Sequence, residues 1–216
     1  MFVERDIAEL MQQIARQDVL EIGSNGTIQH VRGASLAHIA ECYGFEYYET
    51  LRTGHQKAYV LVRMYRDPRP EARAREAAAI TAHPQAGNGG TVPGMRQGTL
   101  KPLAEAAEAV AGMKDRIRFD IGGAAVDKRQ QMTAYGFCAF AALFMAALGK
   151  PVLGLVVGVT LTAFLVGAFR FGAVRRSRIA QRLRDAGYLQ VRDERGAERF
   201  LRPGQQLPGH ANPFAS

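Results

Sequence analysis

The sequence contains two apolar stretches, Met132–Leu148 (MTAYGFCAFAALFMAAL) and Val152–Phe169 (VLGLVVGVTLTAFLVGAF), separated only by Gly149-Lys150-Pro151. Neither stretch contains a charged residue. As helices of 17 and 18 residues they would reach about 26 and 27 Å, close to a bilayer hydrocarbon core of about 30 Å. Lys150-Pro151 would interrupt a single helix through both. The sequence therefore predicts a two-helix transmembrane hairpin over residues 131–172, rather than a buried hairpin in a soluble core.

Positive charge is concentrated on both sides of this hairpin. The connecting turn holds one basic residue, Lys150, whereas eleven lysines and arginines lie within 20 residues before the hairpin or 15 residues after it. Cytoplasmic flanks of membrane proteins carry such an excess. We therefore expect a multi-pass protein of the inner (cytoplasmic) membrane with both termini in the cytoplasm. The first six residues contain no apolar segment, so we expect no cleavable signal peptide.

Residues 1–67 are expected to form a small cytosolic α+β domain. The spacing of apolar residues and turn formers predicts four elements in the order helix, hairpin, helix, hairpin: a helix over 4–17, strands over 19–22 and 27–31, a helix over 35–43, and strands over 45–51 and 57–65. Ser35 and Gly44 are the expected start and end signals of the second helix.

The middle of the chain is predicted to connect the first domain to the hairpin. Residues 68–99 predict an Ala-rich helix over 71–82, followed by a Gly/Pro-rich linker over 83–98 that we expect to be flexible. Residues 100–130 predict an amphipathic helix whose apolar face runs from Leu103 to Ile117. That face could lie on lipid headgroups or pair with a second copy; we favour pairing, because alanine anchors a helix to an interface only weakly.

The chain after the hairpin is short and basic. Residues 173–202 predict a basic cytosolic helix ended by Gly187, followed by a strand pair over 188–191 and 198–201. Of the net charge of +8, a local +6 lies between Arg170 and Arg202. Residues 203–216 contain three prolines and two glycines, and we expect a disordered tail.

Three groups of residues are candidates for contacts. Small residues allow close packing of transmembrane helices, which points to Gly154, Gly158, Ala163 and Gly167. Basic residues after the second helix are candidate contacts for anionic lipid or nucleic acid: Arg175, Arg176, Arg178, Arg182 and Arg184. Alternating aromatic and basic residues on the last strand of the first domain form a candidate partner surface, which also resembles the composition of surfaces that bind single-stranded nucleic acid: Lys57, Tyr59, Arg63 and Tyr65.

The sequence shows no arrangement of residues typical of catalysis. The five histidines are scattered, the two cysteines lie far apart, and neither a metal-ligand spacing nor a phosphate-binding glycine motif is present. We therefore expect no enzyme activity, no cofactor and no metal. The favoured hypothesis is an inner-membrane anchor or assembly subunit that recruits a cytosolic protein partner or associates with itself. The alternatives are an oligomeric pore-forming protein, holin-like or effector-like, and a membrane-tethered nucleic-acid-binding protein.

Overall fold

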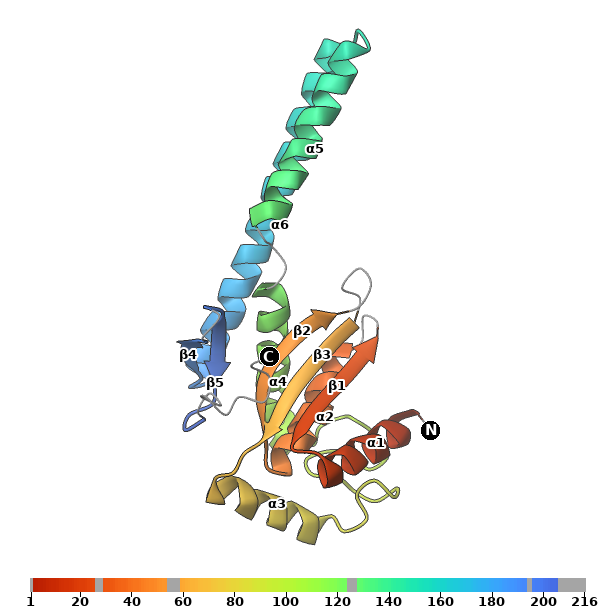
Figure 1. Cartoon of the computed structure of the whole chain (residues 1–216), viewed down its shortest axis with the longest axis vertical. Coiled ribbons are helices and arrows are strands. Elements are labelled where there is room, and N and C mark those ends of the chain that lie inside the picture. The colour runs from red at the N-terminus through yellow and green to blue at the C-terminus, as the bar shows by residue number, and fades with distance from the viewer. Residues whose placement is uncertain (1, 26–28, 54–58, 124–127, 194–195, 206–216) are drawn as a thin grey trace. The chain divides into compact units, whose positions relative to one another are not determined.

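The computed structural model describes residues 2–25, 29–53, 59–123, 128–193 and 196–205 (Figure 1). It is a mixture of helix and sheet with a small N-terminal α/β region and one long apolar helix. The chain divides into two compact units, and one of them is made of two segments that lie far apart in the sequence. The first unit joins residues 1–121 to residues 182–216, and the second contains residues 122–181.

The first unit holds most of the secondary structure. Its elements are α1 (Phe2–Arg16), β1 (Val19–Asn25), α2 (Gln29–Cys42), β2 (Phe45–Thr53), β3 (Tyr59–Arg66), α3 (Pro70–Ala82), the 3-10 turn η2 (Ala104–Ala106), nearly all of α4 (Ala107–Gly123), β4 (Leu189–Arg192) and β5 (Glu198–Leu201). The second unit contains α5 (Lys128–Ala147) and most of α6 (Pro151–Asp185).

A three-stranded antiparallel sheet organises the first unit, with β3 between β1 and β2. Its alternation places Val60, Val62 and Met64 on the buried face. Helix α2 covers that face, which Figure 1 shows behind the strands, with Gly33 lying near Val62. Helices α1 and α4 contribute to the same core through Ile7, Leu10, Ile14, Val110, Met113, Ile117 and Ile121.

Several predicted elements are confirmed. The helices over 4–17 and 71–82 are α1 and α3, the strands over 45–51 and 57–65 are β2 and β3, and the C-terminal strand pair is β4 and β5. Gly44 ends α2 with a positive φ of 84°, and Gly187 ends α6 with a φ of 82°, a conformation that favours glycine.

The first predicted hairpin is wrong. Residues 29–31, expected in its second strand, belong to α2, and β1 pairs instead with β3, which is remote in sequence. Helix α2 also begins six residues earlier than predicted. Ser35 is not its cap but lies inside it, with its hydroxyl 2.9 Å from the carbonyl oxygen of Leu100. The helix packs through Leu36 and Ile39 and also through the small residues Ala34, Ala37 and Ala40.

Three other expectations differ from the structure. The segment expected to be a flexible linker contributes Val92 and Met95 to the core. The apolar face of the helix near residues 103–119 packs inside its own unit, so it is not available for headgroups or a second copy. The basic helix expected after the hairpin is the continuation of α6, which has no strong helix breaker between Phe169 and Asp185. The predicted tail beyond Gln205 lies outside the described residues.

Candidate functional site

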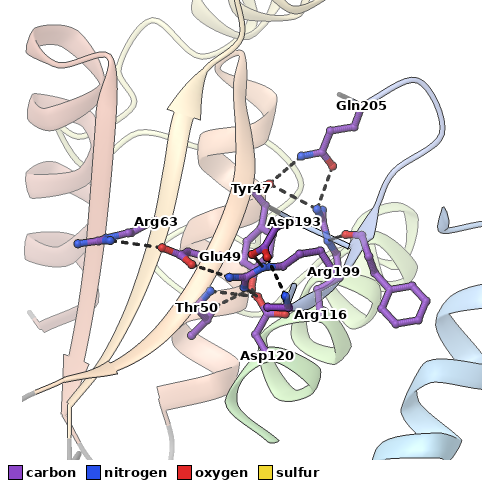
Figure 2. A network of polar contacts seen from close by, with 11 residues as sticks. Tyr47, Glu49, Thr50, Arg63, Arg116, Asp120, Asp193, Arg199 and Gln205 are labelled. Atoms are coloured by element: carbon purple, nitrogen blue, oxygen red, sulfur yellow. Dashed lines mark hydrogen bonds and ion pairs between the residues drawn. The ribbon is translucent and has the colours of Figure 1, made fainter. Parts of the chain in front are cut away.

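The first unit contains a buried polar network. It connects residues that precede helices α5 and α6 with residues that follow them. We call it the junction network (Figure 2). It joins β2 and α4 to the C-terminal segment, and its members are Tyr47, Glu49, Thr50, Arg116, Asp120, Asp193, Arg199 and Gln205.

Arg199, on β5, is the centre of this network. Its guanidinium donates to Glu49 at 2.6 Å, to Asp120 at 3.1 Å and to Asp193 at 3.1 Å. The side chain of Arg199 is 10% exposed and those of Glu49 and Asp120 are 1% and 4% exposed. A buried charge without its partner costs several kcal/mol, so residues 1–121 depend on residues after the hairpin to satisfy their own carboxylates.

Arg116, on α4, makes a second connection and is 1% exposed. It donates to the carbonyl oxygen of Phe200 at 3.0 Å and to the side-chain oxygen of Gln205 at 2.9 Å. The guanidinium also lies over the ring of Tyr47, 4.4 Å from its centroid. These contacts hold the end of the described C-terminal segment against α4 and β2.

Asp120 links the network to the backbone of the sheet. It accepts hydrogen bonds from the hydroxyl of Tyr47 at 2.6 Å and from the amide of Thr50 at 3.1 Å. Burial raises the pKa of Asp120, and the neighbouring Arg199 opposes that rise. The amide of Thr50 on β2 is thus hydrogen-bonded to a side chain of α4.

Glu41 and Glu46 extend the acidic lining of this junction. Glu41 pairs with Arg202 and lies 3.6 Å from Arg116. Glu46 is 2% exposed and accepts a hydrogen bond from Arg75 at 3.1 Å. Burial, and then the nearby charge of Glu41, raise the pKa of Glu46.

One cysteine and one histidine lie close together on α2. Cys42 lies 3.8 Å from His38, but burial raises the pKa of its thiol to about 11, which leaves almost no nucleophilic thiolate at neutral pH. Among the residues that the structure describes, no three His, Cys, Asp or Glu side chains are grouped so as to hold a metal ion.

Helices α5 and α6 pack along each other as an antiparallel hairpin (Figure 1). A Cβ atom at Gly154 would lie 2.6 Å from the carbonyl oxygen of Ala142, and one at Gly158 would lie 2.8 Å from the Cβ of Ala142. These two predicted packing residues therefore face the partner helix within the chain. Ala163 is exposed, and a Cβ atom added at Gly167 would meet no other part of the described structure within 4 Å.

The outer surface of this hairpin is apolar and open. Phe140 and Phe164, for example, are 65% and 72% exposed. Helix α6 is long and apolar enough to cross a membrane, and 6% of its most apolar window is buried. The apolar part of α5, Met132–Ala147, is shorter than the 18 residues needed for a candidate spanning helix. By length and composition the chain thus has one candidate spanning helix among the described residues, which weakly suggests membrane association.

The five predicted arginines have different environments. Arg182 pairs with Asp115 at 3.3 Å, and Arg184 donates to the side chain of Gln190 at 2.6 Å. Arg176 is half-buried, whereas Arg175 and Arg178 are exposed. The five do not form one continuous basic surface, because two of them contact neighbours in their own unit.

The predicted partner surface lies on the sheet face opposite α2. Tyr59, Arg63 and Tyr65 are half-buried there. Arg63 already pairs with Glu21 at 2.9 Å and with Glu49 at 3.3 Å. The fourth predicted member, Lys57, lies outside the described residues.

The junction network was not predicted from the sequence. Its signal was nevertheless present: Glu46 and Glu49 interrupt the aromatic first half of the strand, and Arg199 and Arg202 bracket Phe200-Leu201. Buried charges of opposite sign in two strands indicate pairing, but the sequence does not show that the two strands meet.

Comparison of the chain with known protein families, curated proteins and solved structures found no match.

Proposed function

We propose that this chain is a non-enzymatic subunit of the inner membrane, in which the hairpin of α5 and α6 anchors the α/β unit on the cytoplasmic side. The anchored unit recruits a protein partner or takes its place in a larger membrane assembly. Support comes first from the exposed apolar surface of the hairpin, since soluble monomers rarely expose apolar patches of more than a few hundred Å².

The observation that carries the proposal is the junction network. Glu49 and Asp120 precede the hairpin, Arg199 follows it, and the three side chains meet in one compact unit. If α6 alone crossed a bilayer, Arg199 would be on the opposite side from both carboxylates. A hairpin that crosses twice keeps both of its ends on one side. The junction network therefore favours two crossings, with α5 accommodated by local thinning or by snorkelling of flanking residues.

The cytoplasmic side is favoured by charge. The turn of the proposed hairpin carries only Lys150, and its two flanks carry the eleven basic residues. A pore is less well supported, because Gly154 and Gly158 pack within the hairpin and no acidic, basic or histidine side chain except Lys150 lies between Met132 and Phe169. Membrane-embedded pathways for ions or protons usually contain such residues.

Replacing the hairpin tests the anchor. Because Asp115 and Arg182 are paired, a linker of about 12 Gly/Ser residues, with an average span of roughly 20 Å, can substitute for residues 124–178. The full chain should stay with membranes in alkaline carbonate, whereas the linker variant should be soluble and unfold cooperatively. Release of the full chain by carbonate, or stable membrane binding of the linker variant, would contradict the proposal.

A photo-crosslinker tests partner recruitment. We place it at Tyr59, on the proposed partner surface, and as a control at Ile80, which is exposed on α3. In membranes, adducts to a second protein should form from position 59 and not from position 80. Adducts to the same chain alone would indicate self-assembly through this surface. No adduct at position 59 would remove it as the partner surface.

A further inference from the structure

Three arginines near the end of the apolar part of α6 point away from their own chain. Arg170, Arg175 and Arg178 are exposed, and none of their side chains makes a hydrogen bond or ion pair with another residue that the structure describes. The side chains of Arg182 and Arg184, one to two turns further on, do have such partners, and Arg176 is half-buried. Arg170, Arg175 and Arg178 thus form an outer group among the arginines after the apolar segment.

The unpaired group lies on one side of the helix. With 3.6 residues per turn, the three positions fall within about 140° around the axis, and they span about 12 Å along it. The same sector presents Phe171 and Val174, which are 72% and 47% exposed. Exposed apolar and basic side chains therefore alternate along this part of α6.

This mixture fits the headgroup layer of a bilayer. The polar region adds about 5–8 Å on each side of the hydrocarbon core, and α6 ceases to be apolar at Phe169. Arg170 would lie at the boundary, and the long side chains of Arg175 and Arg178 can bend back toward phosphate groups. Phe171 and Val174 would then lie in the interfacial layer just outside the hydrocarbon core. We infer that Arg170, Arg175 and Arg178 form a binding surface for anionic lipid headgroups; this inference rests on the proposed insertion of the hairpin.

The charge distribution favours lipid over nucleic acid. Residues 1–121 carry fifteen basic and fifteen acidic side chains, whereas residues 122–181 carry seven basic residues and a single aspartate. Six of the eight excess positive charges thus lie in the segment with the exposed apolar surface. A nucleic acid would gain nothing from Phe171 and Val174 along a duplex backbone, whereas a bilayer interface accommodates both kinds of side chain.

The test is the lipid selectivity of the full chain. The protein is placed in nanodiscs of equal phosphatidylcholine and phosphatidylglycerol, and the lipids retained after release are counted by native mass spectrometry. The wild type should retain more of the anionic lipid. The variant R175A/R178A should lose that preference by about fivefold per arginine, since a basic residue near an anionic surface contributes about 1 kcal/mol. The matched control is R52A/R96A, which removes the same charge from two exposed sites outside the hairpin.

The outcomes separate this inference from the anchor. If R175A/R178A still inserts and resists carbonate but its anionic preference falls by this factor, the headgroup surface is supported. If it keeps the full preference, or if R52A/R96A loses as much, the inference is overturned and the anchor stands. Salt-sensitive binding of a DNA duplex that depends on Arg175 and Arg178, without any lipid preference, also overturns it. Failure of the wild type to resist carbonate contradicts the anchor itself.

Discussion

The guanidinium of Arg199 lies 2.6 Å from the carboxylate of Glu49, although 150 positions and the whole α5–α6 hairpin separate the two residues in the chain. Both side chains are buried. The hairpin is therefore an insertion in a unit that is completed only by the residues that follow it. This relationship determines which membrane topologies are compatible with the fold, and it makes the stability of the α/β unit depend on a segment at the far end of the chain.

Replacing Arg199 with alanine should destabilise the unit by about 3–5 kcal/mol, because Glu49 and Asp120 would remain buried without their main counter-charge. Urea unfolding of the full chain in detergent measures the effect. The control is Arg192→Ala on the neighbouring strand β4, where the side chain is exposed and the expected change is within about 0.5 kcal/mol. Equal effects of the two substitutions would show that the ion pairs of Arg199 contribute nothing specific.

Replacing Glu46 with glutamine should alter the pH dependence of stability. Burial raises the pKa of Glu46 above its ordinary value of 4.5, so the folded state binds the proton more tightly than the unfolded state. The stability associated with that proton is fully present below pH 4.5 and is lost as the pH rises through the folded pKa. Glutamine stays neutral, so the unfolding free energy of E46Q relative to wild type should increase with pH across this window.

Urea unfolding at a series of pH values above 4.5 checks this prediction. Glu71→Gln, at an exposed position of α3, is the matched control and should show no trend. A difference between E46Q and wild type that stays constant with pH would contradict the proposed cost of ionising Glu46.

Replacing Gly158 with leucine should disrupt the packing of α5 against α6. A Cβ atom at this position is already 2.8 Å from Ala142, and overpacking of this kind costs about 1–3 kcal/mol. Gly167→Leu is the control, because a Cβ atom added there would meet nothing within 4 Å outside its own stretch of helix. Thermal unfolding of the full chain in mild detergent should separate the two variants. A loss of stability in G167L as large as that in G158L would instead indicate association between copies.

The sequence predicted those elements whose signals are local. Apolar spacing identified α1, strand alternation identified β2 and β3, and Gly44 and Gly187 identified the ends of two helices. The close contacts at Gly154 and Gly158 also follow a local pattern of small residues, although the sequence left open whether they face the same chain or another copy.

What the sequence could not provide were relationships between distant segments. The Gly23–Gly26 turn suggested that β1 pairs with the next segment, but β1 pairs with β3 because that register buries Leu20 and Ile22 beside Val62 and Met64. Likewise, the sequence alone suggested that Arg199 and Arg202 belong to a basic surface segment. Their role depends on acidic partners some 150 residues earlier, and no local pattern contains that information.

Single-cysteine labelling tests the double crossing most directly. In a background with Cys42 and Cys138 replaced by alanine, one cysteine is placed at Thr99 before the hairpin, at Lys150 in its turn, or at Asp185 after it. Each variant is treated with a membrane-impermeant thiol reagent in intact cells and in inverted membrane vesicles. Cysteines at 99 and 185 should react only in inverted vesicles, and the cysteine at 150 only in intact cells. Labelling of positions 99 and 185 from opposite sides would contradict the hairpin and the junction network together.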